Sequence, residues 1–326
     1  MIKNDLTSQY AGLKLKNPIV VASSGQTDSA AKIKKLAEAG VAAVVIKSLF
    51  EEQLEGLTQQ LSQEQAHVEA YDYINQYVKS NEIEKHLEII RTAKKENDIP
   101  IIASVNCFKS GKWVEYAKHL VDAGADALEV NIMRLETDLN ADPTLVIRDY
   151  LAIAKEISNE VNVPVAVKLD RHFSTLVSLI DRLSYTGIKG VTLFNRSYRM
   201  DVDIQHERIV SGKILTSSED LADTLRYTGL ISARVPKVCL SASTGIHTAE
   251  DALKALLVGA SNVQLCSTLY QNGPSQIQTI LQGIDSWMSG KQYQSISEFR
   301  GKLKAHEEDA TLYSRMQFMK YFSNKE

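Results

Sequence analysis

A helix that ends in glycine, followed within a few residues by a short apolar strand, recurs along this chain and most constrains its fold. The repeated glycines are Gly40, Gly124, Gly187 and Gly259, and the strands expected after them span residues 43–46, 127–130, 191–194 and 263–265. Glycine favours the left-handed backbone conformation that ends many helices. The repeat therefore predicts four turns that lead from a helix into a strand.

Four further apolar strands are expected, and each begins at a proline. They span residues 18–21, 100–103, 164–167 and 236–240, and helical patterns at 30–38, 113–122, 145–160 and 249–257 lie between strands. Short apolar strands that alternate with helices indicate a parallel sheet covered by helices. Eight such units predict an α/β fold of the (β/α)8 TIM barrel class, with an open doubly wound sheet as the alternative.

The length of 326 residues suits one such barrel. We expect a single domain, residues 1–326, with an insertion at about 51–79 after the second strand and a helical extension at about 291–326. A polar segment at 196–215 follows the sixth strand. The additions at strand ends would extend the loops of the barrel mouth, where active sites of this fold are built.

Composition and charge argue against several classes of protein. The formal net charge is -3, so nothing in the overall charge draws the chain to nucleic acid. No signal peptide or membrane span is expected from the hydropathy pattern, and no Gly-x-Gly-x-x-Gly fingerprint of a dinucleotide site is found. The three cysteines, Cys107, Cys239 and Cys266, lack the spacing of disulfides, a metal site or an iron–sulfur centre. We therefore expect a cytoplasmic protein without a metal.

Small or polar residues follow all eight expected strands. In chain order they are Ala22, Ser23, Ser24 and Gly25; Lys47 and Ser48; Ser104, Asn106 and Cys107; Asn131; Lys168; Asn195; Ser241, Ala242, Ser243, Thr244 and Gly245; and Cys266, Ser267 and Thr268. Lysines, hydroxyls and amides at one end of a barrel favour an anionic ligand with many hydrogen-bonding groups. The loops after strands seven and eight are the usual phosphate site of such barrels.

In order and spacing, these segments resemble the soluble dihydroorotate dehydrogenases over roughly residues 10–290. The matching stretches are NPIVVASSG at 17–25, VIKS at 45–48, LEVN at 128–131, VAVKL at 165–169, VTLFN at 191–195, GIHTAEDA at 245–252, GASNVQL at 259–265 and GP at 273–274. The resemblance implies an FMN-dependent oxidoreductase of pyrimidine biosynthesis that acts on CH–CH bonds. A small anionic substrate and a homodimer are expected with it.

By this resemblance, the strand ends hold the FMN. The implied cofactor-binding residues are Ala22, Ser23, Lys47, Ser48, Ser104, Asn131, Lys168, Asn195, Ser243, Thr244, Gly245, Cys266 and Ser267. Lys47 and Lys168 would lie near the polar edge of the flavin, and the loops at 243–245 and 266–267 would hold the phosphate. A fixed cation near the ring raises its electron affinity, because reduced flavin carries negative charge.

The chain departs from the family where a substrate would react. Arg134 stands where the family has the Cys or Ser that accepts a proton, and a guanidinium stays protonated in proteins. The catalytic candidates are Lys47, Asn131, Arg134 and Cys107, with Asp170 and His172 as further candidates for the base. Arg134 either clamps a substrate carboxylate or forms an ion pair with Glu136 or Asp138 away from the flavin.

Other departures keep several functions open. The insertion at about 51–79 lacks the substrate loop of the family, and Ser243–Thr244 and Cys266 replace glycines of its phosphate loops. The first hypothesis is a dihydroorotate dehydrogenase, and the second is a flavin enzyme for another ring or enoate substrate. The third is a non-redox, phosphate-binding barrel that acts as a lyase, isomerase or synthase. Arg134 leads us to expect poor oxidation of dihydroorotate itself.

Overall fold

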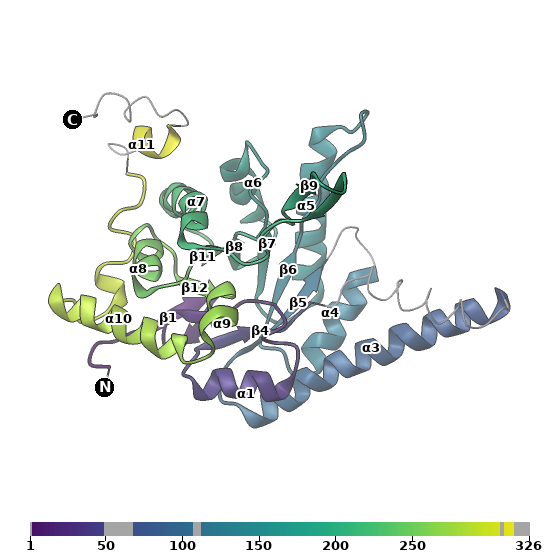
Figure 1. Ribbon diagram of the computed structural model, residues 1–326, viewed down its shortest axis with the longest axis horizontal. Helices are drawn as coiled ribbons and strands as arrows, with labels where there is room; N and C mark the ends of the chain where they lie inside the picture. Colours follow the sequence, from purple (N-terminus) through teal and green to yellow (C-terminus); the bar gives the residue numbers. More distant parts are fainter. Residues whose placement is uncertain (1, 49–67, 107–111, 307–309, 316–326) are drawn as a thin grey trace.

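The computed structural model describes residues 2–48, 68–106, 112–306 and 310–315. Parallel strands close into a barrel in the order β11-β12-β3-β4-β5-β6-β7-β8 (Figure 1). They are β3 (Ile19–Val21), β4 (Ala43–Val45), β5 (Ile101–Asn106), β6 (Ala127–Asn131), β7 (Val165–Leu169), β8 (Gly190–Leu193), β11 (Cys239–Ser243) and β12 (Asn262–Leu265). The predicted (β/α)8 barrel is confirmed. The open sheet is excluded because β11, the first strand in this order, pairs with β8, the last, as well as with β12.

Helices surround the barrel and fill the connections between its strands (Figure 1). They are α1 (Ala30–Glu38), α3 (Val68–Glu96), α4 (Lys112–Asp122), α5 (Pro143–Glu160), α6 (Leu176–Leu183), α7 (Leu221–Arg234), α8 (Ala249–Leu257), α9 (Ser267–Asn272), α10 (Gln276–Gly290) and α11 (Ala310–Ser314). The four repeated glycines all have positive φ. At Gly259 φ is +115°, and a Cβ would lie 2.4 Å from the Ser232 hydroxyl oxygen. The predicted turns are therefore confirmed.

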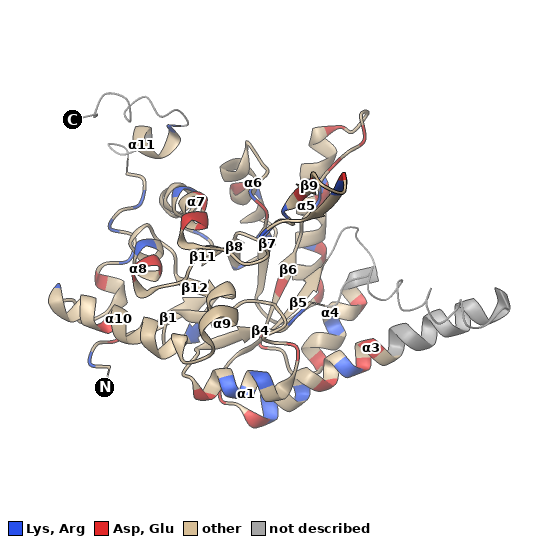
Figure 2. Ribbon diagram, viewed as in Figure 1, with Lys and Arg blue, Asp and Glu red and all other residues tan. Residues whose placement is uncertain are grey.

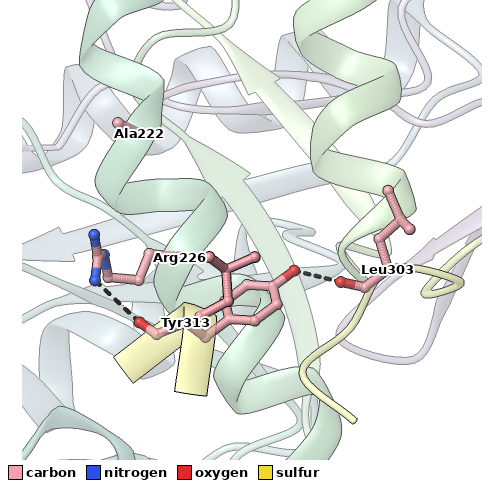
Figure 3. Close-up of a pocket in the computed structure, with 5 residues that line it drawn as sticks. Ala222, Arg226, Leu303 and Tyr313 are labelled. Carbon is pink, nitrogen blue, oxygen red and sulfur yellow. Dashed lines mark hydrogen bonds between the residues drawn. The ribbon is translucent and has the colours of Figure 1, made fainter. Parts of the chain in front are cut away.

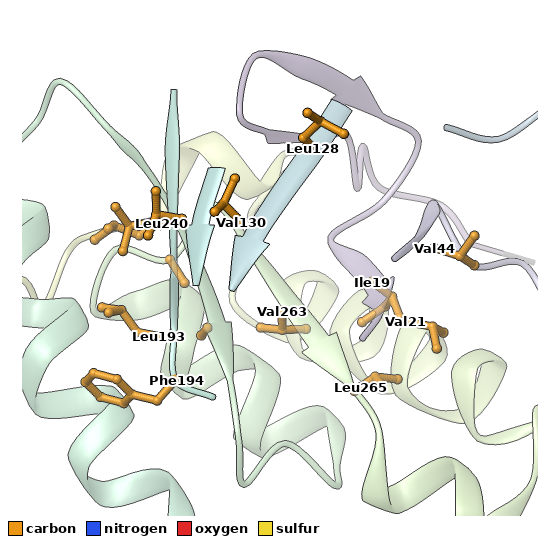
Figure 4. Packing of buried hydrophobic residues seen from close by; sticks show 14 of the residues in the cluster. Ile19, Val21, Val44, Leu128, Val130, Leu193, Phe194, Leu240, Val263 and Leu265 are labelled. Atoms are coloured by element: carbon orange, nitrogen blue, oxygen red, sulfur yellow. The ribbon is translucent and has the colours of Figure 1, made fainter. Parts of the chain in front are cut away.

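The outer faces of the strands form the hydrophobic core between barrel and helices (Figure 4). Ile19 and Val21 on β3 are fully buried, and so are Val263 and Leu265 on the neighbouring β12. Because side chains alternate along a strand, these residues point towards the helices and those between them point into the barrel. Burial of each such side chain stabilises the fold by about 1.5–3 kcal/mol. Packing of the outer strand faces against the helices therefore stabilises the fold, and the inner faces can hold polar side chains.

A hairpin that the sequence pattern did not predict covers the N-terminal end of the barrel. Its strands, β1 (Ser8–Tyr10) and β2 (Leu13–Leu15), are short and mix polar with apolar residues, so no apolar run marks them in the sequence. Tyr10 and Leu15 pack with the inward-facing Val45 in a second buried cluster. Apolar residues thus fill this end of the interior, and the polar inward-facing residues lie nearer the mouth.

The seventh barrel strand begins later than expected. It spans Cys239–Ser243 rather than 236–240, because its pairing with β8 starts at Cys239 opposite Gly190. Pro236 has no N–H to donate to a neighbouring strand.

Several expected loop residues belong to strands. They are Ser104, Asn106, Asn131, Lys168, Ser241, Ala242 and Ser243. The β5–β6 pairing continues until Asn106 lies opposite Asn131, so the sheet fixes the direction of both side chains. The mouth is therefore more rigidly built than loops alone would make it.

The additions to the barrel are described in part. The polar segment at 196–215 contains a hairpin of β9 (Met200–Asp203) and β10 (Arg208–Ser211). Within the insertion expected at about 51–79, residues up to 67 lie outside the described residues, and the remainder begins α3. The extension expected at about 291–326 includes the 3-10 helix Ile296–Glu298 and α11, while 307–309 and 316–326 lie outside the described residues.

Lysine and arginine positions alternate with aspartate and glutamate positions along several outer helices (Figure 2). Helix α3, for example, presents both lysines and glutamates along the part whose side chains are described. In the described part of the chain, no helix combines the length and the apolar character that crossing a membrane requires.

Candidate active site

The inward-facing residues towards the C-terminal ends of the strands form a polar interior. They are Ser104, Asn106, Glu129, Asn131, Lys168, Thr192, Ser243 and Gln264, and all are buried. Side-chain hydrogen bonds between different strands join several of them across the barrel. A buried polar group without a partner is costly, so this interior needs either internal partners or a ligand.

Glu129 lies in this interior with no exposed surface. Its Oε2 accepts hydrogen bonds from the Tyr10 hydroxyl at 2.8 Å, the Thr192 hydroxyl at 2.7 Å and the Gln264 amide at 2.7 Å. Burial, and then the charge of Glu129, raise the pKa of Tyr10 well above its usual value, so Tyr10 remains a donor. Three neutral donors from three parts of the chain therefore hold one oxygen of a buried carboxylate.

Lys168 on β7 provides the cation beside this carboxylate. Its Nζ lies 3.6 Å from Oε1 of Glu129 and 3.4 Å from Oε1 of Gln264. The Lys168 residue is only 6% exposed, so it is not a solvated surface lysine. An ammonium group has three protons, so Lys168 keeps donor capacity for a ligand at the mouth.

Hydroxyls and amides connect the neighbouring strand ends. The Ser48 Oγ lies 2.6 Å from the Ser104 Oγ, and the Ser48 N–H donates to the Ser23 Oγ at 3.0 Å. On the other side of the barrel, the Asn195 amide donates to the Asn131 Oδ1 at 2.9 Å. Five of the predicted site residues thus form two hydrogen-bonded groups.

Lys47 is half-buried directly after β4. Its carbonyl oxygen lies 2.7 Å from Nε2 of His86 on α3, and Nδ1 of His86 contacts the Tyr116 hydroxyl on α4. Burial lowers the pKa of His86, which favours a neutral ring that donates to Lys47 and accepts from Tyr116. Two outer helices therefore fix the backbone from which the Lys47 side chain extends.

A cavity of about 80 Å³ lies at the mouth, where β8, β11 and β12 end. Nine predicted cofactor-binding residues line it: Ala22, Ser23, Lys168, Asn195, Ser243, Thr244, Gly245, Cys266 and Ser267. Phe194, Arg196, Thr216, Ile246 and Gln264 complete its wall. An adjacent cavity of about 140 Å³ shares Asn195, Arg196 and Thr244 with the first and adds His172. Residues far apart in the sequence therefore converge on one site.

The backbone after β11 has an unusual conformation. Thr244 and Gly245 have φ values of +76° and +86°. A Cβ on Gly245 would lie 2.4 Å from the backbone nitrogen of Leu221, so only glycine fits. Thr244 adopts the left-handed conformation at a cost of about 1–2 kcal/mol, and its hydroxyl donates to the Phe194 carbonyl at 2.9 Å. The loop therefore has the positive φ angles that glycine favours, although one of the two residues is a threonine.

Arg134 is engaged by carboxylates on the outside of the mouth. Its guanidinium pairs with Glu136 and, at 3.1 Å, with Asp149 on α5. The pair with Glu136 is one of the two alternatives expected from the sequence, and Arg134 lines neither cavity at the mouth. Cys107, another catalytic candidate from the sequence, lies outside the described residues.

Asp170 and His172 follow β7 and form a pair. Asp170 is 1% exposed, and its Oδ1 accepts the His172 N–H at 2.7 Å and lies 3.1 Å from the His172 Nδ1. The His172 side chain is half exposed and lines the larger mouth cavity. A buried carboxylate that orients an accessible imidazole is an arrangement suited to general base catalysis.

The sequence pattern missed several residues that line or support the mouth. They are Glu129, Thr192, Phe194, Arg196, Thr216, Ile246 and Gln264. Glu129, Thr192 and Gln264 stood inside expected strands, where a polar residue between apolar neighbours was the available signal. Arg196 and Thr216 lie at the two ends of a polar segment, and no signal separates them from its other polar residues.

A larger cavity, of about 370 Å³, lies on the outside of the barrel between α7 and α11 (Figure 3). Arg226 on α7 donates to the carbonyl of Tyr313 at 3.0 Å, and the Tyr313 hydroxyl donates to the Leu303 carbonyl. The residues that line this outer cavity include none from the end of a barrel strand. The mouth, where the polar interior opens, is therefore the better candidate for chemistry.

Comparisons with known proteins agree with this geometry. The family model described as dihydroorotate dehydrogenase matches residues 5–288. The dihydroorotate dehydrogenase B (NAD(+)) catalytic subunit of Thermoplasma acidophilum is 27% identical, over 91% of this chain and 98% of that protein. The dihydroorotate dehydrogenase A (fumarate) of Lactococcus lactis is 23% identical, over 92% of this chain and 99% of its own length. The resemblance inferred from the sequence is confirmed over nearly the whole chain.

We predict that Lys168→Met destabilises the flavin-free protein. The substitution leaves the buried Glu129 carboxylate without a cation, and loss of one partner of a buried pair typically costs about 3–5 kcal/mol. Adding Glu129→Gln should restore part of this free energy of unfolding, measured by urea denaturation. Lys189→Met, at an exposed lysine, is the control and should change stability by less than about 0.5 kcal/mol. A Lys168→Met protein as stable as the wild type would contradict the pairing.

Proposed function

The chain belongs to the dihydroorotate dehydrogenase family, and from this premise we propose a cytoplasmic, single-domain oxidoreductase that uses FMN at the barrel mouth. The proposed reaction is oxidation of dihydroorotate, or of a related anionic compound, at a CH–CH bond next to a carbonyl. The observation that carries the proposal is the convergence of nine strand-end residues on one cavity beside a buried lysine. Family membership does not favour the non-redox alternative.

The chemistry of the mouth fits FMN. Arg196 Nη1 and Asn106 Oδ1 are buried and have no hydrogen-bond partner among the described residues, so the site offers a donor and an acceptor to a ligand. The flavin ring has both donors and acceptors at its polar edge, and its phosphate is an anion. We propose that residues 22–23, 47–48, 104, 131, 168 and 195 bind the ring or substrate, and that 243–245 and 266–267 bind the phosphate.

The residues of the chain have separate tasks in this proposal. When bound, FMN supplies the acceptor for two electrons. Lys168, held beside Glu129, and the half-buried Lys47 provide positive charge at the mouth, where negative charge develops. Asn131 and Asn195 orient the reacting ring through their amides, which are already bonded to each other. The strands fix these groups before a ligand arrives, so little reorganisation is needed.

The proton released from substrate needs an acceptor, and we assign it to His172. Arg134, at the position of the family base, is a permanent cation paired with Glu136 and Asp149. An imidazole can accept a proton through its free nitrogen, and the Asp170 carboxylate holds one nitrogen of His172. We propose that Arg134 braces its loop, while His172 in the larger mouth cavity takes the proton.

We also propose that the chain forms a homodimer. The β9–β10 hairpin presents an apolar face, since Met200, Val202 and Ile209 are between 54% and 68% exposed. Val202 lies directly opposite Ile209 in the antiparallel pairing, so their side chains share one face. An exposed apolar surface of this kind is typical of a contact between proteins, and a second copy is the occupant we propose.

Anaerobic mixing of the flavin-loaded protein with dihydroorotate tests the reaction. Because His172 can take the place of the family base, the flavin absorbance should bleach in the wild type, contrary to the poor oxidation expected from Arg134 alone. His172→Gln should slow bleaching by about 100-fold or more because a general base is lost. Arg134→Ala, at the position of the family base, is the matched control and should stay within a few fold. Equal rates in wild type and His172→Gln would refute the assignment of the base. Failure of dihydroorotate to bleach the wild type would refute it as the substrate.

Light scattering during gel filtration tests the dimer. The wild-type chain should elute with the mass of a dimer, and the double variant Val202→Asp and Ile209→Asp should elute as a monomer. These substitutions place charge in the proposed interface, where it would be desolvated without a partner. Leu139→Asp changes an exposed leucine on another loop and should leave the dimer intact. A monomeric wild type would rule the homodimer out.

A further inference from the structure

Arg196 directly follows Asn195 and has only part of its hydrogen-bonding capacity used. Its Nη2 donates to the carbonyl of Lys213, at the end of the β9–β10 hairpin. Its Nη1 is buried and has no hydrogen-bond partner among the described residues. A buried cationic donor without an acceptor is costly, so its position calls for an anion in the site.

The surroundings of Arg196 contain donors and hydroxyls. It lines the smaller mouth cavity together with Thr216, Thr244, Gly245 and Ser267, and no carboxylate lines this cavity. Two aspartates line the adjacent cavity. Each of these is already paired with another arginine, Asp220 with Arg199 and Asp223 with Arg171. In the described part of the mouth, Arg196 is thus the arginine without a carboxylate in ion-pair contact.

The charge balance around Arg196 also favours an added anion. Burial, and then repulsion from Arg199, lower the pKa of Arg196, and attraction to Asp220 offsets these effects only in part. An anion in the cavity would offset both effects.

We propose that Nη1 of Arg196 donates to the terminal phosphate of the flavin mononucleotide. This inference rests on the proposed function and adds a side-chain cation to its phosphate site. The cavity wall favours phosphate over a substrate carboxylate, because residues 243–246 and 266–267 in it belong to the loops at the ends of strands seven and eight, the usual phosphate site of barrels. The Ser267 Oγ, which accepts the Thr216 N–H at 3.0 Å, brings the Arg196–Thr216 segment against the second of these loops.

The proposal gives a reason for the altered phosphate loops. Ser243–Thr244 and Cys266 stand where the resemblance leads us to expect glycine, and a side chain limits how closely a backbone can approach a phosphate. A guanidinium can bind phosphate through a charged, directional hydrogen bond and does not need that close approach. Arg196 thereby compensates for the loss of these glycines.

The test compares FMN with riboflavin, which lacks the phosphate. Both are titrated into the full chain freed of flavin, and binding is followed by quenching of flavin fluorescence. Arg196→Ala should weaken FMN binding by about 10- to 100-fold and leave riboflavin binding unchanged. Arg196→Lys should recover part of the loss, because it restores the charge without the planar fork. Arg171→Ala removes a paired arginine from the adjacent cavity and should preserve the FMN-to-riboflavin ratio.

Each outcome decides a separate question. An unchanged FMN-to-riboflavin ratio in Arg196→Ala overturns the proposal, and so does a variant that alters only the KM for an anionic substrate. If wild type binds neither flavin, the proposed function itself fails. If Arg196→Ala does not fold, Arg196→Gln replaces it. Inorganic phosphate then gives a second readout, since it should raise the melting temperature of the flavin-free wild type but not of Arg196→Gln.

Discussion

The buried carboxylate of Glu129 is the interaction on which the arrangement of the site depends. It has no exposed surface, and it accepts hydrogen bonds from Tyr10, Thr192 and Gln264. Its other oxygen lies 3.6 Å from the Lys168 ammonium. One buried charge thus connects the N-terminal hairpin, two further strands and the cation at the mouth. Because a buried carboxylate is costly without such partners, any change to them acts on Lys168 as well.

The barrel divides its interior into two parts with different tasks. Apolar residues, including Tyr10, Leu15 and Val45, fill the end covered by the hairpin, and the outer faces of the strands pack against helices. The fold is therefore stabilised away from the mouth. Polar residues at the strand ends can then meet the needs of a ligand rather than those of packing, as the buried unpaired donor on Arg196 illustrates.

Much of this structure could be predicted from the sequence, because it follows from local periodicity. Helices α1 and α8 have the expected bounds, and the glycines that precede strands have positive φ. The two hairpins were missed because their short strands mix polar with apolar residues, whereas the equally short barrel strands are marked by apolar runs. Glu129 and Arg196 were missed for another reason. Their importance depends on which side chains face each other across the barrel, and only strand register and three-dimensional contacts reveal that.

The central claim is that the polar mouth of this barrel binds FMN. The most direct measurement is the visible absorption spectrum of the full-length chain after incubation with excess FMN and gel filtration. The account predicts flavin bands that travel with the protein at one flavin for each chain, with a spectrum altered from that of FMN in water. A colourless protein, from which all the FMN separates on the column, would contradict it.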